Sequence, residues 1–274
     1  MSRKRRGKGK RRPAASPIRP RRTGKGWLLA GLGLVGVLAL GFSLWEAAAR
    51  RALGPSGEEE ARQHALAQAN GRQGEVLYQA GRLREAEPFL RRAAQLDRGD
   101  GPSRILLGII LYKRHRFEPA LAVLEAARRL APRDPRVSYY LGKVYFELGD
   151  PARARPAFEA TRSLRPDHWG ALRYLGILAF RDGDLRAAET HLRRALALER
   201  DDPEIYYHLG EVCLKTDRYQ EAITHFEAAV ARKPDYRKGY MKLAQAYRLT
   251  GQREAHRRAL ETFLQIPEVP PQPI

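Results

Sequence analysis

Beyond residue 66, small and apolar residues return at a fixed interval of 34 positions. One series consists of Gly74, Gly108, Gly142, Gly176 and Gly210. Twelve residues further on in each unit stand Ala86, Ala120, Ala154, Ala188 and Ala222. Near the end of the unit stand Pro132, Pro166 and Pro234. Because several series keep one phase over the same stretch, they indicate a repeated structural unit, and we predict that these residues are its packing positions.

Each unit is predicted to hold two helices. The first carries apolar residues at helical spacing, as in Ile205, Leu209 and Val212. It ends near a glycine such as Gly149, which suits a left-handed residue after a helix. Asp150 and Pro151 then fit the N-cap and first position of the second helix, which ends before the phased proline. The frames expected are 67–100, 101–134, 135–168, 169–202, 203–236 and 237–266.

The phased glycines predict a close approach of the two helices. Glycine inside a helix costs about 0.5–1 kcal/mol relative to alanine, so five in register need a compensating contact. We expect the glycine at the eighth position of a unit to face the alanine at the twentieth, where a larger residue on either side would separate the helices.

This register resembles that of the tetratricopeptide repeat family over residues 67–266. That family has a small residue at the eighth position, Ala at the twentieth, Leu or Phe at the twenty-fourth, Ala at the twenty-seventh and Pro at the thirty-second. The resemblance implies an all-α fold, a right-handed α-solenoid of helical hairpins. The last unit departs from it, with His256 at the alanine place and Ala255 beside it. This predicts a turn one residue shorter and a terminal capping helix.

An apolar segment precedes the repeats. Residues 27–45 are uncharged and bounded by Trp27 and Trp45. As a helix they would span roughly 28 Å, close to the hydrocarbon thickness of a bilayer, and tryptophan favours the headgroup level. A cleavable signal peptide is the alternative, with a small-residue site at residues 47–49. The long basic region and the long apolar run favour an uncleaved signal anchor, a single transmembrane helix.

The charge of +20 is concentrated before that segment. Residues 1–26 hold 12 of the 51 Lys and Arg residues and no Asp or Glu. The positive-inside rule then predicts a cytoplasmic N-terminus, a cytoplasmic (inner) membrane location and an extracytoplasmic, periplasmic repeat domain. The basic tail is expected to contact anionic lipid headgroups. It has no aromatic residue to stack on bases, so no specific nucleic-acid binding is expected.

Two further segments frame the repeats. Residues 46–66 are expected to form a hinge and a helical spacer, since Gly54–Gly57 breaks the chain and Ser56 with Glu59 fits a capping box. The helix is predicted from about Glu58 toward Gln79. At the other end, residues 267–274 are rich in proline and are expected to form a tail.

Candidate chemistry is sparse. Glu221 and His225 are four residues apart and share a helix face, but two ligands without a third seldom hold zinc. They and His191 fall at ordinary surface positions of second helices. Cys213 takes a repeat position that is apolar elsewhere and is expected to be a buried packing thiol. Without a phosphate loop, nucleophile elbow or HExxH motif, we expect no enzyme, cofactor or metal site.

The resemblance instead implies partner binding in a concave groove lined by the first helices. Carrying over the family's groove positions gives Ile105, Ile109, Tyr112, Lys113, Tyr139, Lys143, Phe146, Glu147, Arg173, Ile177, Phe180, Arg181, Tyr207, Glu211 and Lys215. About a third of these are expected only to pack between repeats. The aromatics and cations favour a protein or extended peptide with acidic groups or a free carboxylate. The only asparagine is Asn70, away from the groove positions, which argues against the family's carboxylate clamp for chaperone tails.

Two functions stay open at this point. One is a membrane-tethered scaffold or adaptor that helps to assemble an envelope complex. The other is a chaperone-like or import-type receptor for chains in transit, with the repeats facing the cytosol.

Overall fold

The computed structural model describes residues 57–267, and in that range the regular structure is helical throughout. The predicted basic tail (1–26), membrane anchor (27–45), most of the hinge and most of the proline-rich tail lie outside the described residues. None of the described helices is both long and apolar enough to cross a bilayer. The described residues from Arg62 onward belong to one compact unit.

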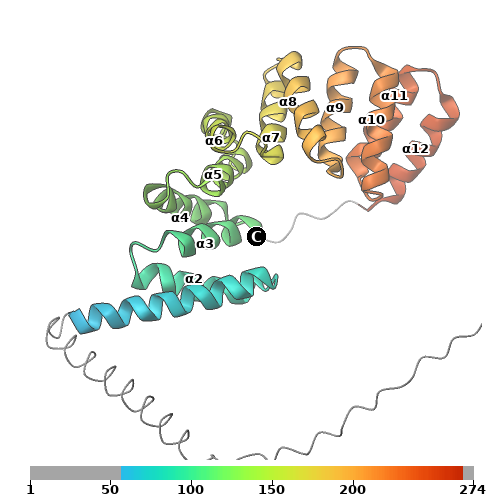
Figure 1. The fold of residues 1–274 in the computed structure, drawn as a ribbon. Helices are drawn as coiled ribbons and strands as arrows, with labels where there is room; N and C mark the ends of the chain where they lie inside the picture. Colours follow the sequence, from blue (N-terminus) through green and yellow to red (C-terminus); the bar gives the residue numbers. More distant parts are fainter. Residues whose placement is uncertain (1–56, 268–274) are drawn as a thin grey trace, which may run out of the picture. The chain divides into compact units, whose positions relative to one another are not determined.

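That unit is a series of antiparallel helical hairpins (Figure 1). A helix over residues 57–79 comes first, which confirms the spacer helix expected to run from about Glu58 toward Gln79. The helices that follow are α2 (Leu83–Leu96), α3 (Gly101–Lys113), α4 (Phe117–Leu130), α5 (Pro135–Glu147), α6 (Pro151–Leu164), α7 (Trp169–Arg181), α8 (Leu185–Leu198), α9 (Pro203–Lys215), α10 (Tyr219–Arg232), α11 (Arg237–Leu249) and α12 (Arg253–Gln265).

Each hairpin packs on the next in chain order. A second helix such as α4 contacts the first helix of its own hairpin, α3, and that of the following hairpin, α5. First helices also contact one another directly, as α3 does α5 and α9 does both α7 and α11. The first helices therefore share one side of the stack, and side chains from successive repeats lie next to each other there.

The turns inside the hairpins confirm the predicted punctuation. The fifteenth residue of each frame has a positive φ, 74° at Gly81, Gly149 and Gly251 and 85° at Gly183. His115 and Asp217 hold the same place with φ 57°, although neither is glycine. Asp150 caps α6 by accepting a hydrogen bond from the Arg153 amide at 2.9 Å. The 34-residue register thus sets the same turn in every hairpin from α2 onward.

The phased glycines do mark the closest approach within each hairpin, but the residue opposite them was predicted wrongly. A Cβ added to Gly108 would lie 2.6 Å from Leu124, and one added to Gly142 would lie 2.7 Å from Phe158. These are residues of the twenty-fourth position. The same holds for Gly74, Gly176 and Gly210, which face Leu90, Leu192 and Phe226; at Gly176 the backbone oxygen of the predicted Ala188 also lies 3.2 Å from an added Cβ. A side chain reaches back toward the N-terminus of its helix, which brings the long residue at position twenty-four over the glycine.

The phased alanines and prolines differ in role. Ala86, Ala120, Ala154, Ala188 and Ala222 are all fully buried and pack between helices, as predicted. Pro132, Pro166 and Pro234 are exposed, each two residues beyond the last residue of a second helix. The prolines therefore end helices and are not packing residues. Cys213 is a buried free thiol, which confirms its predicted packing position.

The predicted shorter turn in the last repeat is wrong. Helix α12 begins at the same place in its frame as α10, and Gly251 makes the usual turn. The register changes instead by rotation of α12, because Ala259 is buried while Leu260, at the twenty-fourth position, is exposed. His256 fills the alanine place, with its ring Nδ1 2.8 Å from the Ala244 carbonyl oxygen.

Candidate binding surface on the first helices

Aromatic and cationic side chains of successive first helices contact one another across the repeats. Tyr112 of α3 meets Tyr140 of α5 with ring centroids 5.6 Å apart, and Phe146 of α5 meets Tyr174 of α7 at 5.1 Å. The Lys113 ammonium lies 5.0 Å from the Tyr78 ring centroid. We call this row the first-helix face; it comprises Tyr78, Tyr112, Lys113, Tyr139, Tyr140, Lys143, Phe146, Tyr174 and Arg181.

Lys143 is at the centre of this face. Its Nζ lies 4.4 Å from the ring centroid of Tyr112, 5.3 Å from that of Tyr140 and 5.5 Å from that of Tyr139. Cation–π attraction holds the ammonium there, and within residues 57–267 it forms no ion pair with an acidic group. Burial, followed by the charge of Arg173, lowers the pKa of Lys143 to about 8 against the opposing charge of Glu147. Lys143 is thus a half-buried cation on which Glu147 acts without forming an ion pair.

The tyrosines around Lys143 stay neutral at physiological pH. Burial raises the pKa of Tyr112 and of Tyr139, and it raises the pKa of Tyr140 to about 12. The Tyr112 hydroxyl donates to Glu147 at 3.3 Å, which ties α3 to α5. The rings therefore form a fixed apolar wall around a positive charge.

Other charges on the first helices already have partners. Arg173 forms an ion pair with Asp202 at 2.5 Å, and both side chains are largely buried. Glu211 lies 3.0 Å from the His208 ring and 3.2 Å from the Lys242 ammonium. Burial alone would raise the pKa of Glu211, but the hydrogen bond from His208 and the nearby charges outweigh it and lower the pKa. Arg173 thus joins α7 to the start of α9, and Glu211 joins α9 to α11, whereas Lys143 forms no ion pair in the described residues.

The groove residues predicted from the sequence divide by burial. Four are buried and pack between helices: Ile105, Ile109, Ile177 and Tyr207. Seven are half-buried: Tyr112, Tyr139, Lys143, Phe146, Arg173, Phe180 and Glu211. Exposed side chains are those of Lys113, Glu147, Arg181 and Lys215. Ile105, Ile109, Ile177 and Tyr207 therefore pack inside the stack, and Tyr174 of the first-helix face is buried as well.

Three residues of this face were missed from the sequence. Tyr78 holds the twelfth position of the first frame, which the register alone would have identified. Tyr140 and Tyr174 hold the sixth position of their frames, which is not one of the family's groove positions used above. Their ring contacts with Tyr112 and Phe146 depend on how neighbouring helices are rotated, and periodicity does not report that rotation.

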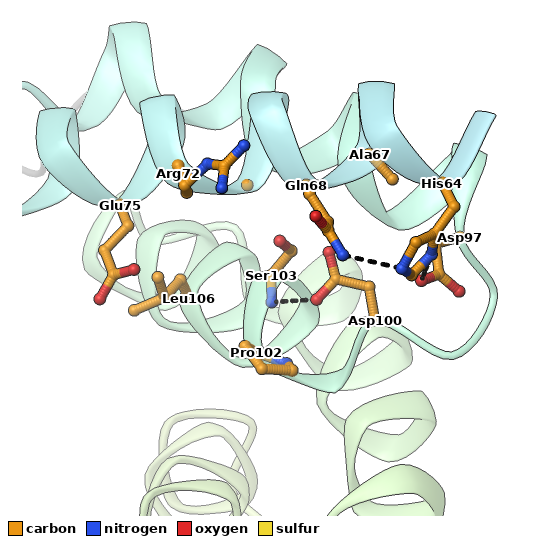
Figure 2. A pocket seen from close by; sticks show the side chains of 11 residues that line it. His64, Ala67, Gln68, Arg72, Glu75, Asp97, Asp100, Pro102, Ser103 and Leu106 are labelled. Carbon is orange, nitrogen blue, oxygen red and sulfur yellow. Dashed lines mark hydrogen bonds and ion pairs between the residues drawn. The ribbon is translucent and has the colours of Figure 1, made fainter. Parts of the chain in front are cut away.

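A pocket of about 380 Å³ lies between the helix over residues 57–79 and α3 (Figure 2). Gln68, Gly71 and Glu75, at the second, fifth and ninth positions of the first frame, line it. Gly71 brings no side chain at the place that Ile105 fills one repeat later. The pocket is acidic, with Asp97 held 3.1 Å from the His64 Nδ1. The pocket therefore lies at the first-helix positions of the first frame, one repeat before the positions of α3.

The Glu221 and His225 pair does not form a centre of its own. Glu221 is exposed and binds Arg218 at 3.2 Å, while His225 is half-buried near the Tyr206 ring. Burial lowers the pKa of His225, with the charge of Arg193 adding to the effect. Residues 57–267 contain no group of three or more His, Cys, Asp or Glu side chains able to hold a metal ion.

Solved structures similar to this one share its architecture. One chain of the Cut9–Hcn1 hetero-tetramer of the APC/C aligns with a TM-score of 0.65 and 17% identity, over 77% of this chain and 44% of that chain. This chain therefore spans less than half the length of that relative. PilF of Pseudomonas aeruginosa aligns with a TM-score of 0.64 and 15% identity, over 74% of this chain and 92% of that one. YrrB, described as a repeat protein with an unusual peptide-binding site, aligns at 0.52 with 21% identity, over 65% and 91%.

Family models agree with this architecture. One model described as tetratricopeptide repeat matches residues 77–144, and a second with the same description matches residues 141–189, 175–237 and 209–267. A search of curated protein sequences gives no match. Together the models cover residues 77–267, and the hairpins, turns and phased contacts follow the same register. The chain belongs to the tetratricopeptide repeat family.

Proposed function

We propose that this protein is a membrane-tethered interaction scaffold that binds an extended segment of a partner protein along the first-helix face. Lys143 carries the proposal. It is a half-buried ammonium, held by three tyrosine rings, with no acidic partner in residues 57–267. A positive charge in this setting gains most when a ligand supplies the missing carboxylate.

The surroundings of Lys143 favour an extended peptide carrying an acidic group. Tyrosine rings from two neighbouring repeats lie around the ammonium, and aromatic side chains are frequent anchors in protein interfaces. Lys113 and Arg181 are exposed at neighbouring places of the same face. The Arg181 guanidinium lies 4.3 Å from the Phe146 ring centroid, so it presents charge beside an apolar surface. The peptide-binding site named in the description of YrrB supports the same use of this fold.

The location is the second part of the proposal. The apolar segment 27–45 anchors the chain in the cytoplasmic membrane, with the basic residues 1–26 on the cytoplasmic side against anionic headgroups. The repeats then lie outside the cytoplasm, where the scaffold helps to assemble an envelope complex.

Protease accessibility tests the location. A tag at the N-terminus and a second tag after residue 267 are followed while protease is added to spheroplasts. Cleavage of the repeats with protection of the N-terminal tag supports the envelope scaffold. Protection of the repeats until the membrane is broken overturns the topology, and a cytosolic receptor for chains in transit becomes the better explanation.

Crosslinking tests the surface. A photoreactive residue replaces Lys113 on the first-helix face, and a matched chain carries it at Arg129, which is exposed on the second helix α4. A single crosslinked partner from position 113, absent from position 129 and lost on Lys143→Met, is the expected result. Lys233→Met, an exposed lysine at the end of the second helix α10, is the control that should leave the crosslink intact. Equal crosslinking from both positions would show that the first-helix face is not the binding surface.

A further inference from the structure

An arginine cluster surrounds one buried carboxylate between the first two hairpins. Glu87 of α2 has a side chain only 8% exposed. It accepts hydrogen bonds from Arg91 at 2.6 Å, from Arg116 at 2.8 Å and from Arg114. Three guanidinium groups therefore surround one carboxylate, which leaves an excess of two positive charges. None of these residues belongs to the first-helix face.

The hairpin turn sets this geometry. Arg114 and Arg116 flank His115, whose positive φ reverses the chain between α3 and α4. Arg91 reaches Glu87 from one helical turn further along α2. Burial disfavours the ionised form of Glu87, but the hydrogen bond from Arg91 and the charges of Arg114 and Arg116 outweigh it and lower its pKa. Glu87 is thus ionised and holds the guanidinium groups in fixed positions, while each keeps unused N–H donors.

The same arrangement recurs three repeats later with its charges balanced. Glu189, Arg193 and Arg218 hold the frame positions of Glu87, Arg91 and Arg116, and both arginines bind Glu189 at 2.7 Å. A second carboxylate joins them, since Glu221 lies 3.2 Å from Arg218. The first cluster has Pro119 at the place of Glu221 and Arg114 at the place of Thr216. The Glu189 cluster shows that two arginines with balanced charges are enough to link two hairpins. The two extra positive charges of the Glu87 cluster therefore require another explanation.

Two arginines of the Glu87 cluster, Arg91 and Arg114, line a pocket of about 300 Å³. Arg84, Arg91, Arg92 and Arg114 line it, together with Glu87, Pro88 and Gln95. Arg84 and Arg92 are exposed and form no ion pair with any residue of the described range 57–267. Four guanidinium groups thus line one hollow that contains a single carboxylate, and two of them have no counter-ion there.

We propose that this pocket binds a dianionic phosphoryl group, as inorganic phosphate or as a phosphate ester. Planar guanidinium forks match the spacing of phosphate oxygens and bind them through paired hydrogen bonds. The four guanidinium groups that line the pocket exceed its one carboxylate by three positive charges, which is enough to balance a dianion. Glu87 does not compete with the ligand, because its oxygens already accept from three arginines.

Calorimetric titration of the purified full chain with inorganic phosphate, at constant ionic strength, tests the site. Arg84→Ala removes a guanidinium that makes no ion pair within the described residues, so the fold is not at risk. Its matched control is Arg186→Ala, the same frame position in the balanced cluster, also exposed and without an ion pair in that range. Arg114→Thr copies the balanced cluster at a second position. Each change at the first cluster should weaken phosphate binding by about tenfold, as expected for loss of hydrogen bonds between charged groups.

Arg186→Ala should leave the affinity unchanged, whatever the basic residues 1–26 contribute, since they are common to all variants. Equal weakening by Arg84→Ala and Arg186→Ala, or no effect of Arg84→Ala and Arg114→Thr, overturns the site. Phosphoserine and vesicles containing phosphatidic acid then separate the sources of the group. If Arg84→Ala weakens the binding of phosphoserine but not of the vesicles, the ligand is a soluble phosphate ester. If it weakens the binding of the vesicles but not of phosphoserine, the ligand is a lipid headgroup.

Discussion

Two glycines of one hairpin, Gly142 and Gly149, are required for different reasons. We therefore predict that alanine and asparagine rank in opposite order as substitutes at the two positions. A Cβ on Gly142 would lie 2.7, 2.8 and 2.9 Å from three ring carbons of Phe158, which is fully buried. Carbon atoms in contact normally lie about 3.5–4.0 Å apart, so a shift of about 1 Å is needed. Gly149 has no heavy atom within 4 Å of such a Cβ, but its φ is 74°.

The magnitudes follow from these two situations. Overpacking costs about 1–3 kcal/mol and alanine gains about 0.5–1 kcal/mol over glycine inside a helix, so Gly142→Ala should lose up to about 2.5 kcal/mol. Gly142→Asn should lose more, because it adds volume and a polar group at a buried position. At Gly149 alanine is forced into the left-handed region at about 1–2 kcal/mol, whereas asparagine tolerates that region and should lose less.

Denaturant unfolding followed by circular dichroism measures all four variants. Because repeat arrays can lose two-state behaviour, the slope of the transition is compared with that of the parent chain before free energies are derived. Alanine should be the better substitute at position 142 and asparagine at position 149. If alanine is the better substitute at both positions, the backbone conformation does not limit the turn; if asparagine is better at both, the contact with Phe158 is not tight.

Three further outcomes are expected. His115→Gly should raise the free energy of unfolding by about 0.5–1 kcal/mol in the same denaturation assay, because it relieves a left-handed non-glycine residue in the first αL turn that lacks glycine. Asp202→Ala should cost about 3–5 kcal/mol, since it leaves the largely buried Arg173 without its partner, and the double variant with Arg173→Met should recover part of that loss. Affinity for an acidic segment should fall as pH rises through about 8, where Lys143 loses its proton, and Lys143→Arg should keep the affinity at higher pH, as fluorescence anisotropy with an acidic peptide can measure. Without ligand, the effect of Lys143 on folding stability has the opposite pH dependence. Between pH about 8 and 10.5 the unfolded state binds more protons at this lysine than the folded state does, so this residue makes the free energy of unfolding rise with pH.

The helices and their order could be predicted from the sequence because packing positions repeat in phase. Periodicity reports which residues share a helix face, and it placed the turn at Gly149 correctly. It does not report how far a side chain extends or how a helix is rotated on its neighbour. This is why Phe158 opposite Gly142, the rotation of α12 and the burial of Tyr207 were not anticipated.

The features that distinguish one repeat from another depend on contacts that no single frame contains. Glu87 belongs to the first frame and its partners Arg114 and Arg116 to the second, so the charge excess appears only once the hairpins are stacked. Lys143 likewise depends on Tyr112 from the preceding repeat. In a solenoid the shared register stabilises every hairpin alike and cannot by itself select a partner. Specific binding must therefore come from places where neighbouring frames differ, and the unpaired Lys143 and the surplus arginines around Glu87 are two such places.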